Sequence, residues 1–484
     1  MQTFFSSFFS SRAFNHFIKC SLLASSLPLG PLVKADSICL LNDPVDAALA
    51  RYDLATKAKS ELNIAYYSIG GEGDISAIYG LAVLRDTVRR GVKVRLLVDA
   101  MFNQISKSMC AHLINEGVEI RVFHPFNPLM PLRHNRRLHD KLFITDRTRL
   151  ITGGRNIDDT YFDLHQTNRN RVDRDILVEG ETALLANDYF MSIWDSKLVS
   201  PVYIGRYRCL VQQKQTPIGM PFSRRRAPPP LHRMIFRRDL NRAGEQLDVA
   251  WESLQLPRKG KDGFRDIDWE KHLKPVDSIR FLTDPGGRKL REQNTVFHIT
   301  NRIQQAVPGE KIWIESPYFI LTRRTHKVLS KALARGVRVV VLTNSINSTE
   351  NLLVQAVYQY RKPAYLSMGI EIYEFSGAQN LQQGLSLHSK SIVFEKAGVG
   401  IVGSFNIDPR SEFFNTEVAV EFNSKDLADG LLKSIKSRIN KKAVRIGIDG
   451  LPVNGQPRFF DATHKKIRRM KWLTYPALMF DFLL

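Results

Sequence analysis

The chain has 484 residues, enough for two domains of ordinary size, each with its own core. Its apolar content of 43% excludes a mainly disordered protein. The formal charge of +22 predicts attraction to a polyanion, either nucleic acid or an anionic lipid surface, and charge alone does not choose between them.

The N-terminal residues 1–35 are typical of a targeting segment. Arg12, His16 and Lys19 precede an apolar stretch over residues 20–33, and a small-residue cleavage pattern follows it. Prolines and a glycine interrupt this stretch, which is short for a membrane span. We therefore expect export through this segment, ahead of an uncleaved anchor or a disordered start.

Two longer stretches, residues 36–213 and 276–445, repeat one order of predicted elements. In each, an apolar strand precedes a helix, a Gly turn and a β-branched strand. The helix is expected over residues 77–90 and 325–335, and the second strand over residues 92–98 and 337–342. Strands that are apolar on both faces and alternate with helices indicate a mainly parallel sheet covered by helices. We predict an α/β fold of two tandem α/β/α domains, related by a pseudo-twofold axis, from one duplicated unit.

Two segments differ from these repeats. Residues 214–275 are basic and contain a run of prolines, and we interpret them as a solvated linker, with contact to lipid headgroups as the alternative. Residues 446–484 form a tail in which a basic cluster and Trp472 precede a short apolar end. That end is too short to cross a membrane. The tail suits an interfacial membrane anchor and docking on the protein's own core about equally.

The most specific feature of the chain is a motif that occurs twice. Its members are His139, Lys141, Asp146 and Gly153-Gly154-Arg155-Asn156, and then His388, Lys390, Glu395 and Gly403-Ser404-Phe405-Asn406. A His and a Lys two residues apart on an extended strand lie on the same face. One such pair is a weak signal, but the whole pattern is very unlikely to occur twice by accident. It predicts one site built from two halves, with two histidines and two lysines around a single phosphate.

This duplicated pattern, H-x-K-x4-D followed by G-[GS]-x-N, resembles the phospholipase D superfamily. Stretches such as 91–99, 315–319 and 403–411 narrow the resemblance to the bacterial cardiolipin synthases of the C type, from about Leu40 onward. The resemblance implies an active site at the interface of the two domains and a place at the bacterial cell envelope. Three features depart from the family pattern: Glu395 replaces the usual Asp, the stretch before Gly403 is one residue longer than its counterpart, and Gly154 replaces the commoner Ser.

The residue types in the motif suit chemistry on a phosphodiester. Such an anion repels nucleophiles, so catalysis needs local positive charge, a group that attacks and a group that protonates the leaving oxygen. Lys141 and Lys390 can supply the charge, and we expect Asn156, Asn406 and Ser404 to bind the substrate phosphate. The sequence contains no cysteine-histidine cluster or H-E-x-x-H motif, so we expect neither a metal nor a cofactor.

The family resemblance implies a covalent phosphohistidine intermediate. We assign His139 as the nucleophile and His388 as the acid and base, although the reverse order stays open. Glu417 resembles the family's orienting carboxylate, and we expect Asp175 to be its counterpart in the first half; either could instead be a surface acid.

Two acidic members of the motif, Asp146 and Glu395, are placed with the catalytic set, although in the family this position is mainly structural. We therefore expect the Glu at position 395 to change packing more than chemistry.

The resemblance favours phosphatidyl transfer between two phospholipids to form cardiolipin at a membrane surface, with peripheral association. Phosphatidylglycerol is the expected acceptor, and phosphatidylethanolamine is a further candidate substrate. The motifs do not encode whether water or an alcohol accepts the group, so a phospholipase D that releases phosphatidic acid is the first alternative. A nuclease ranks low, because superfamily nucleases are commonly short chains with a single motif, and intact motifs argue against a binding protein without catalysis. The oligomeric state stays open.

Overall fold

The structure is a computed structural model that describes residues 36–125, 135–165, 167, 169–211, 229–255, 267–284, 294–376, 384–453, 455 and 462–483. All of these residues belong to one unit, Asp36–Leu484. The predicted targeting segment, residues 1–35, lies outside the described residues.

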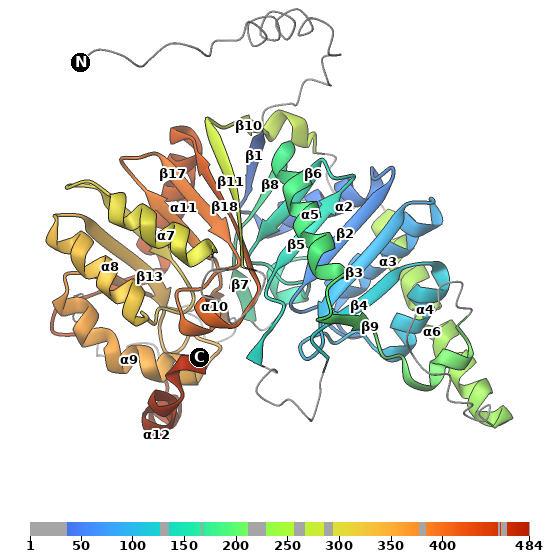
Figure 1. Cartoon of the computed structure of the whole chain (residues 1–484). Helices are drawn as coiled ribbons and strands as arrows, with labels where there is room; N and C mark the ends of the chain where they lie inside the picture. The colour runs from blue at the N-terminus through green and yellow to red at the C-terminus, as the bar shows by residue number, and fades with distance from the viewer. Residues whose placement is uncertain are drawn as a thin grey trace, which may run out of the picture. The chain divides into compact units, whose positions relative to one another are not determined.

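The first half of this unit is built on a nine-stranded sheet (Figure 1). In spatial order its strands are β10 (Lys274–Pro275), β1 (Ser37–Leu41), β8 (Asp175–Glu179), β6 (Arg149–Gly153), β5 (Lys141–Thr145), β2 (Glu61–Tyr66), β3 (Lys93–Asp99), β4 (Glu119–Phe123) and β9 (Val199–Pro201). Its helices are α2 (Pro44–Thr56), α3 (Ile75–Arg89), α4 (Lys107–Glu116), α5 (Glu181–Trp194) and α6 (Pro230–Gln255).

The second half repeats the plan on an eight-stranded sheet. Its strands are β11 (Ser278–Asp284), β18 (Glu417–Asn423), β17 (Val399–Gly403), β16 (Ser391–Phe394), β12 (Lys311–Glu315), β13 (Arg338–Asn344), β14 (Glu371–Phe375) and β19 (Ala443–Ile446). Its helices are α7 (Asn294–Gln305), α8 (Arg323–Ala334), α9 (Leu352–Ser367), α10 (Pro409–Phe413), α11 (Lys425–Lys442) and α12 (His464–Met479).

Each sheet contains both parallel and antiparallel strands, and the sequence predicted only the parallel part. β2, β3 and β4 are parallel, as are β12, β13 and β14, and a helix returns the chain between successive members. The other strands of both sheets pair antiparallel, for example β5 with β6 and β16 with β17. The α/β fold with two similar halves is confirmed, and parallel pairing is found in these three adjacent strands of each sheet.

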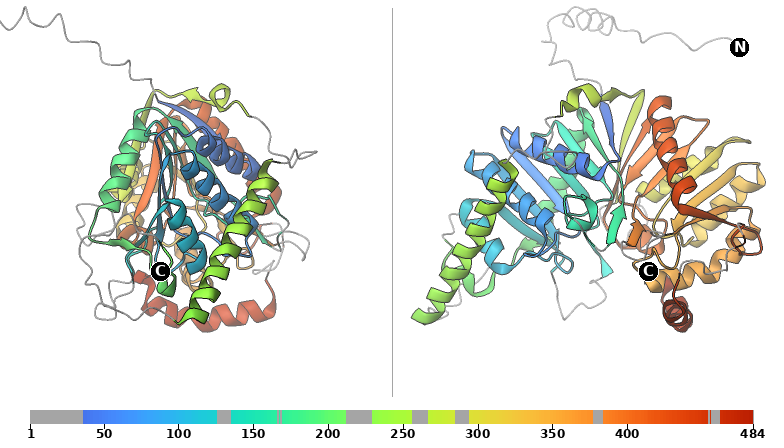
Figure 2. Two further views of the ribbon diagram at one scale, coloured as in Figure 1. Left: turned by 90° about the vertical axis from the view of Figure 1, so that its right-hand side faces the viewer. Right: turned by 180° about the vertical axis from the view of Figure 1, so that it is seen from behind.

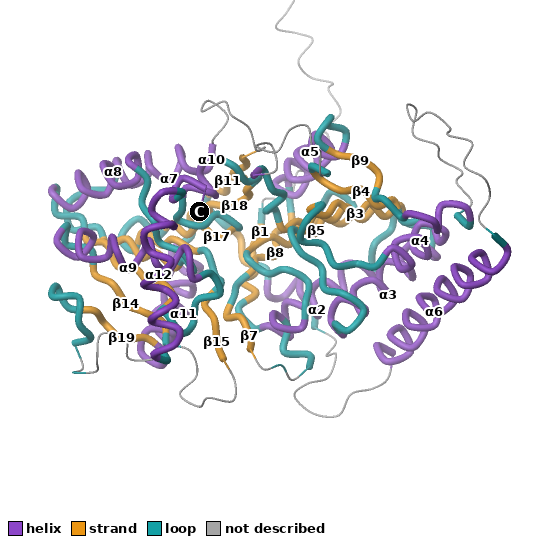
Figure 3. The backbone as a smooth tube through the Cα atoms, turned by 90° about the horizontal axis from the view of Figure 1, so that it is seen from below, coloured by secondary structure: helices purple, strands orange, loops and turns teal. Residues whose placement is uncertain are grey.

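Apolar packing joins the two halves. One core cluster lies under α2, α3, α4 and α6 on the first sheet, and another lies under α7, α8 and α9 on the second. A third cluster takes side chains from both sheets together with α5 and α11, so it belongs to both halves. A two-stranded parallel sheet, β7 (Arg169–Val172) with β15 (Gly384–Leu387), adds a direct backbone link between them (Figure 3).

The segment predicted as a linker contains a long helix. α6 covers 26 residues and packs on α3 and α4, and its buried Leu240, Ala243, Leu247 and Leu254 join the first core (Figure 2). The middle of this segment is therefore a structural part of the first half. Its flanking residues 214–228 and 256–266 lie outside the described part of the chain.

The tail also forms a helix. α12 lies against α9, where Met470 and Ala477 are buried in a small apolar cluster with Ile320 and Val357 (Figure 3). Within the described ranges, no helix combines the length and apolar character that crossing a membrane requires.

Candidate active site

The two H-x-K segments lie where the halves meet. Each leads into a buried strand, β5 after His139 and β16 after His388. Each is also bonded to the other half: Thr416 donates its backbone N–H to the carbonyl of Arg137, and His388 donates its own to the carbonyl of Val172 (2.9 Å in both cases). The backbone therefore places both histidines at one interface.

His139 is oriented by Glu417 of the second half. Both carboxylate oxygens lie 2.9 Å from its Nδ1 atom, and both side chains are buried. The carboxylate is held in turn by the hydroxyl of Ser404 and by the amide of Asn415 at 3.2 Å. This partner fixes the proton on Nδ1 and leaves Nε2 as the free lone pair. The orienting role expected for Glu417 agrees with this geometry.

His388 is oriented by Asp173 of the first half, at 2.8 Å from Nδ1. The expectation for Asp175 is wrong, since its carboxylate instead accepts from Arg51 at 2.8 Å and from Arg155 at 3.2 Å. Each histidine therefore takes its carboxylate from the opposite half. This crossed arrangement makes the two half-sites depend on each other.

The sheet register explains why Asp173 has this role. Gly153 pairs with Asp175 across β6 and β8, and Gly403 pairs with Ala419 across β17 and β18. Two residues before each partner stand Asp173 and Glu417, which are therefore equivalent. The stretch between motif and carboxylate is longer in the first half, so counting along the sequence does not find the match.

The unusual Gly154 fits the same comparison. A Cβ atom at Gly154 would lie 2.2 Å from a carboxylate oxygen of Asp173, so this carboxylate occupies the space that a side chain would need. In the second half Ser404 stands at the equivalent place and its hydroxyl donates to the longer Glu417. The pair Gly154 and Asp173 in the first half and the pair Ser404 and Glu417 in the second therefore fill equivalent spaces beside the histidines. Ser404 was expected to bind phosphate, and its hydroxyl instead holds a carboxylate.

The acidic members of the motif are structural. Asp146 accepts backbone N–H groups of Lys59, Ser60 and Glu61 at 2.7–3.0 Å and anchors the turn before β2. Glu395 accepts from the indole of Trp313 at 2.8 Å and pairs with a lysine of α11. Neither contacts a histidine of the motif among the described residues, so their place in the catalytic set is corrected.

The two motif asparagines are buried and keep hydrogen-bonding capacity. Asn156 donates to the hydroxyl of Tyr161 at 3.2 Å, and this hydroxyl also lies 3.4 Å from His388. The amide oxygens of Asn156 and Asn406 have no partner among the described residues. Because the two ends of an amide can exchange by rotation, each can turn its NH2 group to a phosphate. Their expected role in phosphate binding remains a prediction.

Positive charge is concentrated at this interface. Lys141 donates to the carbonyl of His139 at 2.6 Å, and Lys390 lies 2.8 Å from Nδ1 of His388. Burial and, after it, the nearby charge of Lys390 lower the pKa of Lys141 to about 7. Burial likewise lowers the pKa of Lys390 to about 8. Two buried lysine ammonium groups repel each other, and a bound anion would relieve this repulsion. The lysines therefore form a binding site for one anion.

Burial also lowers the pKa of both histidines, with the lysine charges as the next cause. The pKa of His139 lies well below its ordinary value, and that of His388 falls to about 4. Burial raises the pKa of Glu417 to about 7, whereas the charge of Lys390 and the bond to His388 hold the pKa of Asp173 below its usual range. Both histidines are therefore neutral at pH 7 in this structure.

An ion network behind the site was not found from the sequence. The buried Glu315 accepts from Arg174 and from Arg438, each at 2.6 Å, and these side chains come from different halves. Arg438 also donates to the carbonyl of Asp173 at 3.3 Å. Residues more than one hundred positions apart in the chain make these bonds, which is why no local pattern predicts them.

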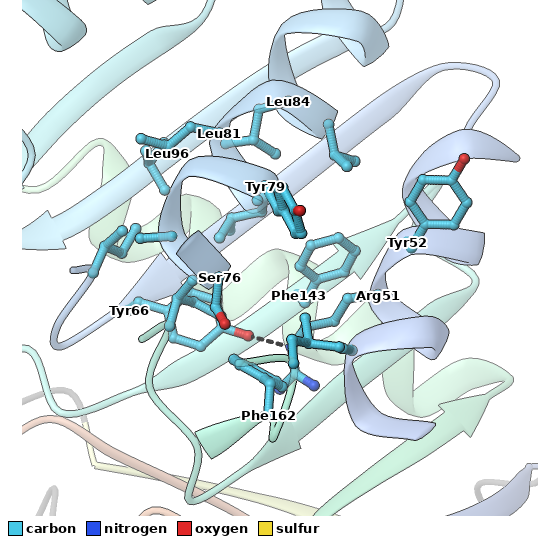
Figure 4. Close-up of a pocket in the computed structure, with 18 of the residues that line it drawn as sticks. Arg51, Tyr52, Tyr66, Ser76, Tyr79, Leu81, Leu84, Leu96, Phe143 and Phe162 are labelled. Carbon is cyan, nitrogen blue, oxygen red and sulfur yellow. Dashed lines mark hydrogen bonds between the residues drawn. The ribbon is translucent and has the colours of Figure 1, made fainter. Parts of the chain in front are cut away.

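An apolar pocket of the first half lies apart from this site. It has a volume of about 90 Å³ between α2, α3 and the sheet, and Figure 4 shows Tyr52, Tyr79, Phe143 and Phe162 around it. Arg51 also lines it and donates to the hydroxyl of Tyr66 at 2.9 Å. None of the expected catalytic residues lines it.

Two half-sites with H-x-K motifs and orienting carboxylates, on two similar α/β halves, define an enzyme of the phospholipase D superfamily. The family model described as cardiolipin synthase, phospholipase D-like domain, matches residues 52–194 and 299–439, and the chain belongs to this family. Both predictions, of the superfamily and of its cardiolipin synthase group, are confirmed.

Relatives and a solved structure agree with this family. Cardiolipin synthase C of Escherichia coli is 29% identical over 414 residues, which cover 80% of this chain and 81% of that protein. An uncharacterized protein of Helicobacter pylori is 28% identical over 86% of this chain and 81% of its own length. The crystal structure of phosphatidylserine synthase from Haemophilus influenzae is similar in fold, with a TM-score of 0.59 and 15% identity, over 93% of this chain and 98% of that one.

Proposed function

We propose that this protein transfers a phosphatidyl group from one phospholipid to a hydroxyl of a second and so forms cardiolipin, with phosphatidylglycerol as acceptor. The observation that supports this most is the crossed pair of carboxylate-oriented histidines beside two buried lysines. This set supplies a nucleophile, an acid and base, and compensation for the phosphate charge. The similarity to a cardiolipin synthase over four fifths of the chain supports the choice of an alcohol acceptor.

In the first step, Nε2 of His139 attacks the phosphorus atom of the donor lipid. A phosphorus–nitrogen bond forms, the bond from phosphorus to the leaving alcohol breaks, and His388 gives its proton to the departing oxygen. Glu417 stabilises the positive charge that develops on His139, because its carboxylate accepts from Nδ1.

In the second step, His388 takes the proton of the acceptor hydroxyl. The acceptor oxygen bonds to phosphorus, the phosphorus–nitrogen bond breaks, and His139 returns to its first state. Lys141 and Lys390 remain beside the phosphate oxygens throughout, and the two asparagine amides donate to them.

His388 takes up its proton from water when the substrate anion binds. Within the protein alone, burial and the charge of Lys390 lower its pKa to about 4. A bound phosphate anion offsets the lysine charge and raises this pKa, while Asp173 favours the imidazolium. The acid is thus available when a substrate occupies the site.

The test is incubation of the purified protein with phosphatidylglycerol, with and without phosphatidylethanolamine, and analysis of lipid products by mass spectrometry. The His139→Ala protein is the inactive control. Cardiolipin as the main product supports the proposal. Phosphatidic acid alone would assign the protein as a hydrolase, and no lipid product in any mixture would overturn lipid chemistry at this site.

A further inference from the structure

α12 exposes one continuous stripe of side chains. Its exposed positions recur every three or four residues, which is the spacing of one helix face. The basic members are Lys465, Arg468 and Arg469, and the apolar and aromatic members that follow are Trp472, Tyr475 and Met479. The opposite face carries Met470 and Ala477, which are buried against α9. The helix is therefore docked by one face and presents the other to its surroundings.

The exposed end of this stripe is unusually apolar for a protein surface. Trp472 and Tyr475 are each 76% exposed and Met479 is 73% exposed, and Phe480 and Phe482 beyond the helix are more than half exposed. Neighbouring large apolar side chains that remain in water typically mark an interaction site. Trp and Tyr are also the residues enriched at the boundary between lipid headgroups and acyl chains.

The basic end of the stripe is not explained by helix stability. Cations in the first turns of a helix oppose its dipole, because the N-terminus carries partial positive charge. α12 has basic residues there and no acidic residue in its first turn. Attraction of these cations to an anionic surface outside the protein would offset their unfavourable interaction with the helix dipole. A helix with cations, Trp and apolar residues on one face matches the chemistry of an interfacial membrane helix.

α12 is joined to residues 347–349, which we call the active-site rim because they bond to β7, the strand whose Val172 accepts from the backbone N–H of His388. Lys466 donates to the carbonyl of Asn347 at 2.8 Å, and the carbonyls of residues 347–349 accept from Arg169 on β7 at 3.0–3.2 Å. Further along β7, Arg171 lies 4.7 Å from the ring of Tyr161, which contacts His388. The helix and the catalytic histidine are thus connected through one short strand.

From this geometry we infer that the exposed stripe of α12 binds the surface of an anionic phospholipid bilayer and holds the active-site rim against it. The inference deepens the proposed function, on which it rests for the nature of the substrate. A lipid headgroup then reaches the catalytic histidines without the whole lipid leaving the bilayer. Charge complementarity selects a membrane over an apolar protein partner, because the stripe is basic at one end and aromatic at the other.

The test is co-sedimentation with vesicles of phosphatidylcholine alone and of phosphatidylcholine with phosphatidylglycerol. One variant, Trp472→Ser with Tyr475→Ser, removes the aromatic part, and a second, Arg468→Gln with Arg469→Gln, removes cations. Tyr203→Ser is the matched control, because Tyr203 is 72% exposed but belongs to the first half. All substituted side chains are exposed, so the variants keep the buried contacts of α12.

We expect each double variant to bind the anionic vesicles at least about ten-fold more weakly than the unchanged protein. The control should bind like the unchanged protein. The cation variant should also lose much of the salt dependence of binding. Turnover of detergent-dispersed lipid should stay within about two-fold, since the stripe does not touch the reacting groups.

Unchanged vesicle binding in both double variants would overturn the inference, whatever products the enzyme forms. A changed oligomeric state with unchanged vesicle binding would do the same and would assign the stripe to contacts between copies of the chain. Vesicle binding does not depend on turnover. Weakened binding without cardiolipin formation would therefore support the docking surface and count only against the proposed function.

Discussion

Variants of two neighbouring aspartates of the first half should have different effects: a change at Asp173 should impair catalysis, and a change at Asp175 should impair stability. Asp173 accepts from His388, while Asp175 lies between the buried Arg51 and Arg155. We expect Asp173→Asn to lower kcat by about 10²-fold or more, the range associated with loss of a working acid and base. The fold should persist, because the backbone N–H that this carboxylate accepts, that of Arg174 at 2.7 Å, can be accepted equally by the amide oxygen of Asn.

The pH dependence of Asp173→Asn has a defined direction. The carboxylate raises the pKa of His388 through its hydrogen bond and its charge. The Asn variant removes this effect, so the pKa of His388 falls further. The limb of the pH–rate profile that reports protonated His388 should move to lower pH. A profile that stays in place while kcat falls would show that Asp173 acts through structure and not through this histidine.

Asp175→Asn should instead reduce stability. The side chains of Arg51 and Arg155 are 8% and 1% exposed, so the variant leaves two buried guanidinium groups without their anion. Breaking a buried ion pair from one side costs about 3–5 kcal/mol. Urea unfolding should show this loss, and the folded fraction should retain most of its kcat. If Asp175→Asn stopped catalysis at full stability while Asp173→Asn remained active, the assignment of the two carboxylates would be reversed and wrong.

Three further outcomes follow from the same structure. Glu315→Gln should lower the free energy of unfolding by about 3 kcal/mol or more in a urea titration, since it leaves two buried arginines without their anion. In the same titration the control Glu371→Gln, which breaks an exposed Arg–Glu pair, should lower it by about 1 kcal/mol or less. Activity on detergent-dispersed lipid should survive chelators, and strict dependence on a divalent ion would contradict the phosphohistidine route. Because Trp472 and Tyr475 are exposed, replacing both with Ser should leave the midpoint of thermal unfolding within about 2 °C by calorimetry.

The sequence predicted the repeated elements because their signals are local. The helix expected over residues 77–90 is α3 (Ile75–Arg89), and the one expected over 325–335 is α8 (Arg323–Ala334), so the bounds differ by at most two residues. Each has a side-chain N-cap, Asp74 or Thr322, just before its apolar face. The two H-x-K motifs were recognised for a similar reason, since all members of each lie along one pair of consecutive antiparallel strands and the residues beside it.

The features that were missed depend on contacts across the interface or on signals hidden by composition. Asp173 is found only from strand pairing, because an insertion separates it from the motif. Glu315 is buried among arginines that lie far away in the chain. α6 was predictable from apolar residues spaced three and four apart, such as Leu240, Ala243 and Leu247, but its many basic residues suggested a solvated linker.

The crossed orientation of the histidines also predicts the turnover of a mixture of two inactive variants. His139→Ala and His388→Ala should each abolish turnover, and the double variant should be no more than about ten-fold worse than either, because nucleophile and acid act as a unit. A core shared by both halves holds the two half-sites of one chain together. The two single variants should therefore remain inactive when mixed, since neither chain can lend its intact histidine to the other without breaking that core. Recovery of turnover on mixing folded single variants would show that half-sites from different chains combine, and the model of one site within one chain would have to be abandoned.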